Sequence, residues 1–111
     1  MKRVYIAGQI SLGDTILNVR NAILAADRVL NAGYAPYLPH LNILWHMVSP
    51  HELEDWLGLD ITWLAQCDAL ILLPGESKGA DIEVSWAKEN GIPVYHGVEE
   101  FIEAVRGEDH A

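Results

Sequence analysis

Residues 69–73 form an uninterrupted apolar run, Ala-Leu-Ile-Leu-Leu, which Pro74 and Gly75 end at once. A short apolar run between turn residues is typical of a strand that is buried on both faces. Such strands occur mainly in parallel sheets, because the crossover connections place helices over both faces. The chain must therefore supply helices on either side of this strand.

Strand and helix patterns alternate along the rest of the chain. Strand patterns occupy residues 4–7, 34–38 and 92–95. Helix patterns run from a cap at Asp14 or Thr15 to Asn31, and over residues 51–66, 79–90 and 98–105. Residues 40–50 are expected to form a loop or a short irregular helix, and residues 107–111 a polar tail. This alternation predicts a doubly wound α/β fold, Rossmann-like or flavodoxin-like, with a mostly parallel sheet of about four strands. Right-handed crossovers favour the strand order 2-1-3-4.

Two of the expected helices carry apolar residues at helical spacing. In the first, which Asp14 or Thr15 can cap, the apolar face comprises Ile16, Val19, Ile23, Ala26, Val29 and Leu30. In the helix at residues 51–66, we expect Leu57, Ile61 and Leu64 to face the core.

The composition fits one globular domain spanning residues 1–111. Half of the residues are hydrophobic, and the formal net charge is −9. This charge disfavours nucleic acid and anionic membrane surfaces as partners, because both require clustered Lys and Arg, but it allows a small anionic ligand. No apolar stretch approaches the ~18 residues of a membrane span, so we expect no membrane partner.

Cys67 is the only cysteine, so the chain cannot form an internal disulfide. This favours a reducing, cytoplasmic location, in which Cys67 is a small buried apolar side chain. No His-x-x-x-His or Cys-x-x-Cys pattern accompanies His40, His46 and His51. We therefore expect no metal site and no cofactor.

In a sheet of this order, ligands bind at the carboxyl ends of the strands, where the strand order reverses. Here that place corresponds to the loops at residues 8–14 and 74–79. The first loop reads Gly8-Gln9-Ile10-Ser11-Leu12-Gly13, and its glycines allow the backbone to approach a ligand closely. It lacks both the P-loop lysine and the G-x-G-x-x-G spacing, so a plain strand-to-helix turn is an equally good interpretation.

The second loop leads through Ser77, Lys78 and Gly79 into a helix whose first N–H groups can bind an anion. Ser77 can cap this helix or bind a ligand, and Lys78 supplies a cation. Glu83 lies about one turn further along, where its carboxylate can face the strand ends. A surface acid stabilised by the helix dipole is the alternative interpretation of Glu83.

Two further polar residues are candidates for the same site. His40 follows Pro39 at the end of the second strand, where a histidine can bind a ligand or transfer a proton. Asp60 flanks the apolar stripe of its helix, and its spacing by itself favours a solvated surface acid. Asp68 precedes the third strand and is expected to bind backbone groups of a turn.

Trp45, Met47 and Trp56 form an apolar surface near the histidines. Core packing or a subunit interface is the plainer interpretation, and a wall on which a flat base stacks is the other. Residues 44–48 and Trp56 would expose more apolar surface than a small monomer usually does. We therefore expect a homodimer or a larger homo-oligomer.

Four motifs follow one another along the chain. They are Val4-Tyr5-Ile6-Ala7-Gly8, Pro39-His40-Leu41, Asp60-x-x-Trp63-Leu64-x-Gln66-x-Asp68 and Ser77-x-Gly79-x-x-x-Glu83. Together, over roughly residues 3 to 95, they resemble the nucleoside 2-deoxyribosyltransferase-like superfamily. Within it the chain looks most like the deoxynucleoside 5′-monophosphate N-glycosidase branch and the small phage and bacterial proteins related to it.

The resemblance implies a glutamate nucleophile, an aspartate partner, a tyrosine near the sugar and a serine–glycine loop for the 5′ end. The corresponding residues are Glu83, Asp60, Tyr5, and Ser77 with Gly79. The position of His40 resembles one near the nucleobase. The remaining expected substrate-binding residues are Gly8, Gln9, Ser11 and Lys78. A carboxylate below the anomeric carbon suits the positive charge that develops on the sugar as an N-glycosidic bond breaks.

In the glycosidase branch the first loop resembles Gly-Ser-Ile-Arg-Gly-Gly, whereas this chain has no arginine there, and Lys78 is the cation that can replace it. We expect an enzyme that cleaves the N-glycosidic bond of a (2′-deoxy)nucleoside 5′-monophosphate or a nucleoside and releases free base. A deoxyribosyltransferase that exchanges bases is one alternative. A non-catalytic nucleotide-binding or sensor module is the other.

Overall fold

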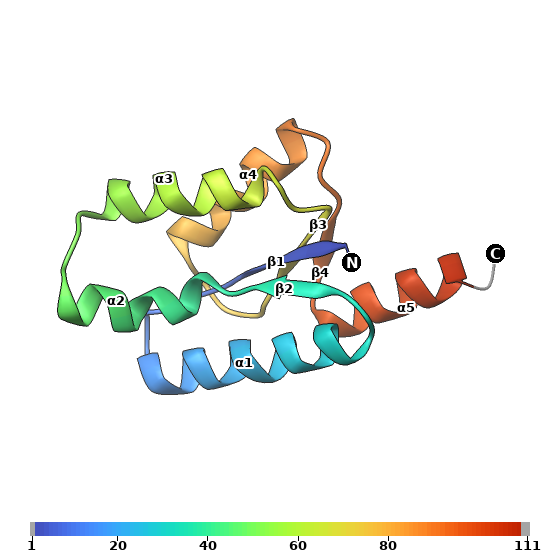
Figure 1. Cartoon of the computed structure of the whole chain (residues 1–111), viewed down its shortest axis with the longest axis horizontal. Coiled ribbons are helices and arrows are strands. Elements are labelled where there is room, and N and C mark those ends of the chain that lie inside the picture. Colours follow the sequence, from blue (N-terminus) through green and yellow to red (C-terminus); the bar gives the residue numbers. More distant parts are fainter. Residues whose placement is uncertain (1, 110–111) are drawn as a thin grey trace.

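A four-stranded parallel sheet forms the centre of the computed structural model, which describes residues 2–109 (Figure 1). The strands are β1 (Arg3–Ala7), β2 (Ala35–Tyr37), β3 (Ala69–Leu72) and β4 (Val94–His96). Their spatial order is β2-β1-β3-β4, and all three neighbouring pairs are parallel. The predicted doubly wound α/β fold with strand order 2-1-3-4 is therefore confirmed.

Helices cover both faces of this sheet (Figure 1). One face packs against α1 (Thr15–Asn31) and α5 (Val98–Asp109), and the other against α3 (Leu53–Leu64) and α4 (Lys78–Glu89). A 3₁₀ turn η1 (Pro39–Leu41) and a short helix α2 (Asn42–Val48) connect β2 to α3. Residues 40–50 were expected to form a loop or a short irregular helix. They include most of η1 and all of the short helix α2.

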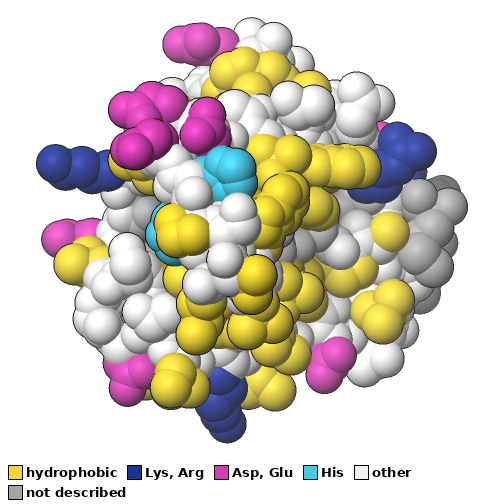
Figure 2. Space-filling model, turned by 60° about the vertical axis from the view of Figure 1, so that its left-hand side comes forward, with side chains coloured by type: hydrophobic (Ala, Val, Ile, Leu, Met, Phe, Trp, Pro, Cys, Tyr) yellow, Lys and Arg dark blue, Asp and Glu magenta, His cyan; other side chains and the backbone are white. Residues whose placement is uncertain are grey.

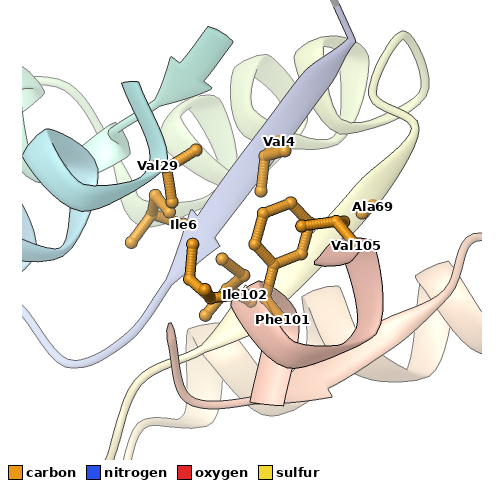
Figure 3. Close-up of a cluster of buried hydrophobic side chains, with 8 residues drawn as sticks. Val4, Ile6, Val29, Ala69, Phe101, Ile102 and Val105 are labelled. Atoms are coloured by element: carbon orange, nitrogen blue, oxygen red, sulfur yellow. The ribbon is translucent and has the colours of Figure 1, made fainter. Parts of the chain in front are cut away.

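Alternate residues of β1 point to opposite faces and create two cores. Val4 and Ile6 belong to the core under α1 and α5, which Figure 3 shows around Phe101. Tyr5 and Ala7 belong to the core under α3 and α4. Full burial of a side chain such as Ile or Phe contributes roughly 1.5–3 kcal/mol, so β1 is anchored on both faces. This places the Tyr5 side chain in the layer that also holds α3 and α4.

The predicted apolar face of α1 is half right: Ala26 and Val29 are buried and Val19 is partly buried, but its three other members are exposed. Asn18, Ala22, Ala25, Ala26 and Val29 are the buried residues of this helix, whereas Ile16, Ile23 and Leu30 are exposed. Small alanines allow the helix to approach the sheet closely, and this packing rotates the larger side chains outward. Asp14 caps the helix as predicted, since its Oδ1 accepts a hydrogen bond from Leu17 N at 3.0 Å.

Two further predictions need correction. The polar tail expected from residue 107 is helical up to Asp109, because backbone hydrogen bonds can continue a helix without an apolar face; residues 110–111 lie outside the described residues. Cys67 is only half-buried, since it lies between α3 and β3 at the edge of the core under α3 and α4. Among residues 2–109, no helix combines the length and hydropathy needed to cross a bilayer.

Candidate active site

Tyr5 and Glu83 form a hydrogen-bonded pair inside the layer between the sheet and α4. Tyr5 is fully buried on β1, and its hydroxyl donates to Glu83 Oε2. Glu83 is 5% exposed. Ser77 caps α4 through a hydrogen bond from Ala80 N to its Oγ at 3.1 Å, so Glu83 lies in the second turn of the helix. Of the two interpretations of Glu83, the surface acid is therefore wrong.

Asp60 is buried beside this pair. It is 8% exposed, and its Oδ1 has no hydrogen-bond partner among the described residues. The spacing of α3 favoured a solvated acid, and this prediction is wrong. Asp60 and Leu64, four residues apart on one helix face, are the buried residues of α3, whereas Leu57 and Ile61 are only partly buried. The apolar stripe therefore does not mark the centre of the buried face.

Burial changes the protonation of both carboxyls. It raises the pKa of Asp60 to about 7. It also raises the pKa of Glu83 to about 7, where the hydrogen bond from Tyr5 opposes the rise and the charge of Asp60 adds to it. Burial, together with the two carboxylates, raises the pKa of Tyr5, so its hydroxyl stays a donor. The cluster is poised to exchange protons near neutral pH.

An aromatic stack extends from Tyr5 to the molecular surface. The rings of Tyr5 and Tyr37 are 5.5 Å apart, and those of Tyr37 and Trp63 are 5.7 Å apart at an interplanar angle of 24°. Burial raises the pKa of Tyr37, an interaction with Asn42 opposes the rise, and the charges of Asp60 and Glu83 add to it. Tyr37 was not among the residues predicted from the sequence, although Tyr5 and Tyr37 are direct partners in the β1–β2 register.

His40 lies fully buried in η1, at the carboxyl end of β2. Neither ring nitrogen has a hydrogen-bond partner among residues 2–109. Burial lowers the pKa of His40 to about 4, so the ring is neutral at pH 7 with one donor and one acceptor. A side chain at Gly8 would place its Cβ 3.5 Å from His40 Nε2 and 3.1 Å from Leu73 Cβ. Gly8 and His40 are therefore neighbours.

The remaining predicted site residues lie on the loop after β1 and at the start of α4. Ser77 and Gly79 form the start of α4, where Ser77 acts as the cap. Ser11 and Lys78 are exposed, and neither side chain makes a hydrogen bond or an ion pair within the described part of the chain. Gln9 Nε2 donates to Asn18 Oδ1 at 3.1 Å. Asn18 was missed by the sequence analysis, since a polar residue in an amphipathic helix carries no distinctive spacing.

No group of three His, Cys, Asp or Glu side chains within residues 2–109 is placed to hold a metal ion. His46 and His51, two of the histidines considered for a metal site, contact Trp56 instead. His46 Nδ1 accepts a hydrogen bond from Trp56 Nε1 at 2.9 Å, and the rings of His51 and Trp56 meet edge to face. Asp68 Oδ2 accepts a hydrogen bond from Arg3 N at 2.8 Å, so it serves a backbone group of β1 rather than of a turn.

Hydrophobic side chains gather at the end of the molecule that carries α2. Figure 2 shows them as a band flanked by histidine and acidic side chains. The exposed members on α2 include Met47, at 74%, and Val48, at 87%. The expected exposure of residues 44–48 is present, whereas Trp56 is partly buried.

Residues 2–96 match the family model described as Domain of unknown function (DUF4406). The chain belongs to the DUF4406 family. The comparison of the sequence with curated proteins gives no match.

Two solved structures are similar to this DUF4406 protein. One is a conserved protein from Enterococcus faecalis V583, with 22% identity and a TM-score of 0.68 over 85% of this chain and 61% of that one. The other is a 2-deoxyribosyltransferase from Bacillus psychrosaccharolyticus, with 18% identity and a TM-score of 0.64 over 83% of this chain and 69% of that one. The chain thus spans 61% of the length of the first relative. At these identities the likeness shows a shared fold.

Proposed function

We propose that this protein cleaves the N-glycosidic bond of a 2′-deoxynucleoside 5′-monophosphate or a nucleoside, with Glu83 as the nucleophile. The observation that carries the proposal is the buried carboxyl pair, in which Glu83 is bonded to Tyr5 and Asp60 keeps an unpartnered oxygen. The fold shared with a protein named as a 2-deoxyribosyltransferase supports the same class of chemistry.

The surroundings of Glu83 and Asp60 favour a different catalytic role for each carboxyl. The Tyr5 hydroxyl donates to Glu83 and so favours its ionised form. Asp60 has no comparable donor, and burial alone acts on it. Two coupled carboxyls titrate as a pair. Because only Glu83 accepts a hydrogen bond from Tyr5, we assign the shared proton to Asp60. Glu83 is then the nucleophile and Asp60 the proton donor.

The first step joins Glu83 to the sugar. A carboxylate oxygen of Glu83 bonds to the anomeric carbon while the bond from that carbon to the base nitrogen breaks, and the base leaves with the electron pair. Asp60 supplies the proton that the departing base requires. In the second step water attacks the anomeric carbon, its proton passes to Asp60, and the ester bond to Glu83 breaks. Free base and sugar or sugar phosphate are the products.

Residues at the start of α4 and around His40 can hold the two ends of the substrate. Ser77, Lys78 and the N–H groups near Gly79 would bind the 5′ end, because a helix N-terminus with a nearby cation suits a phosphate. His40 is neutral and carries one donor and one acceptor, and the resemblance assigns it to the edge of the base. Gly8 lies next to it, where a larger residue would be tight against Leu73. These assignments follow the resemblance and the placement of the residues.

Base exchange is the second candidate, because one similar structure is named as a 2-deoxyribosyltransferase. The same ester at Glu83 would then pass to a second base instead of to water. A large excess of a second free base separates the two reactions. New nucleoside or nucleotide indicates transfer, whereas sugar or sugar phosphate alone indicates hydrolysis.

The test is a panel of nucleosides and nucleotides, with chromatography for free base. Glu83→Gln should lower turnover by ~10²–10³-fold or more while ligand binding persists, because the neutral amide cannot meet the developing positive charge. Glu89→Gln is the matched control, since Glu89 is an exposed acid on the same helix.

A slow 2-fluoro substrate analogue should add one sugar to the intact protein, and peptide mapping should place it on Glu83. A label elsewhere, or full activity of Glu83→Gln, contradicts the assignment of the nucleophile. A protein that binds nucleotides but never releases base is a nucleotide-binding module instead.

A further inference from the structure

Asn18 uses its whole side-chain amide to hold the loop at residues 8–14. Its Nδ2 donates to Ile10 O at 3.0 Å and to Leu12 O at 2.7 Å, and its Oδ1 accepts from Gln9 Nε2 at 3.1 Å. Asn18 is 7% exposed although it lies on a helix with a solvent face. An amide NH₂ has two donors, so both are engaged with loop carbonyls. No carboxylate or hydroxyl can make the same set of bonds.

Gln9 extends this arrangement to the loop after β3. Gly75 has a φ of +118°, and a Cβ built there would lie 2.7 Å from Gln9 Cδ and 2.8 Å from its Oε1. The Gln9 side chain therefore lies directly over the Gly75 backbone, in space that any larger residue would fill. The backbone of Gln9 also lies beside His40, where it partly offsets the effect of burial on the pKa of the ring. One residue thus contacts α1, the loop after β3 and η1.

We propose that Asn18 is a positioning residue, which holds Gln9 across Gly75 so that the loops at residues 8–14 and 74–77 form one rigid unit. These loops follow the two central strands, where the strand order reverses and ligands of such sheets bind. The role at a ligand rests on the proposed function, whereas the coupling of the two loops is a property of the chain alone. The two parts can therefore fail separately.

Backbone ¹⁵N relaxation of the full chain tests the coupling without any ligand. In the wild type, residues 8–14 and 75–77 should show order parameters of about 0.85, and Asn18→Ala should lower both sets below about 0.6. Asn21→Ala, an exposed position on the same helix, should change neither set. Gln9→Ala should loosen residues 75–77 alone, because the bonds from Asn18 to Ile10 and Leu12 remain. Unchanged order at 75–77 in Gln9→Ala would overturn the proposal.

A double-mutant cycle gives a second test. Gly75→Ala introduces both backbone strain and a collision with Gln9, and only the strain remains when Gln9 is alanine. The loss of Tm caused by Gly75→Ala should therefore be smaller in the Gln9→Ala background. Equal losses in both backgrounds mean that Gln9 does not lie on Gly75, and the proposal is then wrong.

Asn18→Asp separates positioning from a purely structural role. The carboxylate can still accept from Gln9 but cannot donate to the loop carbonyls, which it repels. If the loops hold a nucleotide, KM should rise about five- to a hundredfold, in line with two lost hydrogen bonds, while kcat at saturation changes little. A fall in kcat with an unchanged KM would contradict the positioning role. Without turnover in the wild type, the relaxation data still decide the coupling.

Discussion

Replacing Asp60 by asparagine should stabilise the protein above neutral pH. Asp60 is buried with an unpartnered Oδ1, and burial raises its pKa from 3.8 to about 7. A folded-state pKa above the unfolded value means that the folded protein binds the proton more tightly. The stability from this proton is complete below pH 3.8 and is lost as the pH rises through about 7. An asparagine of the same shape has no charge to bury and escapes this loss.

The size of the effect follows from the two pKa values. Between pH 5 and pH 8, a group that titrates at 3.8 unfolded and at about 7 folded loses roughly 2–3 kcal/mol of folding free energy. Solvent near α3 screens part of this charge, so we expect a change of about 1–3 kcal/mol. The charge of Asp60 also raises the pKa of Glu83, so the substitution should relieve part of the same cost there.

Urea unfolding of wild type and Asp60→Asn at pH 5 and pH 8, followed by circular dichroism, measures this difference. The variant should gain on the wild type by the stated amount as the pH rises. Asp27→Asn, an exposed acid on α1, is the control and should show no such gain. A constant difference at the two pH values, or a variant that is less stable at pH 8, would refute the reasoning about burial. In the activity assay, the same variant should slow base release because the proton donor is lost.

Three further predictions concern the Tyr5–Glu83 pair, Lys78 and the oligomeric state. Tyr5→Phe removes the hydrogen bond that lowers the pKa of Glu83. The acid limb of the pH–rate profile should therefore move about one to two pH units upward. An unmoved limb would exclude Glu83 as the group that titrates. Lys78→Ala should weaken nucleotide binding about ten- to a hundredfold more than nucleoside binding in calorimetry, whereas equal losses would show that Lys78 does not read the phosphate. The exposed residues 44–48 predict a homodimer or larger oligomer, which Val48→Asp should dissociate; a wild-type monomer mass at micromolar concentration in light scattering would contradict this.

The strand order and the helix caps were predictable because their causes are local or periodic. The apolar run at residues 69–73 needs cover on both faces, and the alternation of strands and helices leaves few right-handed arrangements. Asp14 and Ser77 cap their helices through bonds that span three residues, so the sequence alone contains both partners. The loops at residues 8–14 and 74–79, where the strand order reverses, were predictable for the same reason.

The candidate site depended on how each helix is rotated about its own axis. Tyr5 and Glu83 are 78 positions apart, and no local pattern shows that they meet. The stripe at Leu57, Ile61 and Leu64 pointed to one face of α3, yet packing against the sheet turned Asp60 inward.

The same cause explains Asn18, which became buried because the small alanines of α1, rather than its larger apolar residues, lie on the sheet. The fold class, and the edge of the sheet at which ligands bind, followed from local and periodic patterns. Only tertiary packing decided which acids lose their water, because desolvation depends on neighbours from other elements.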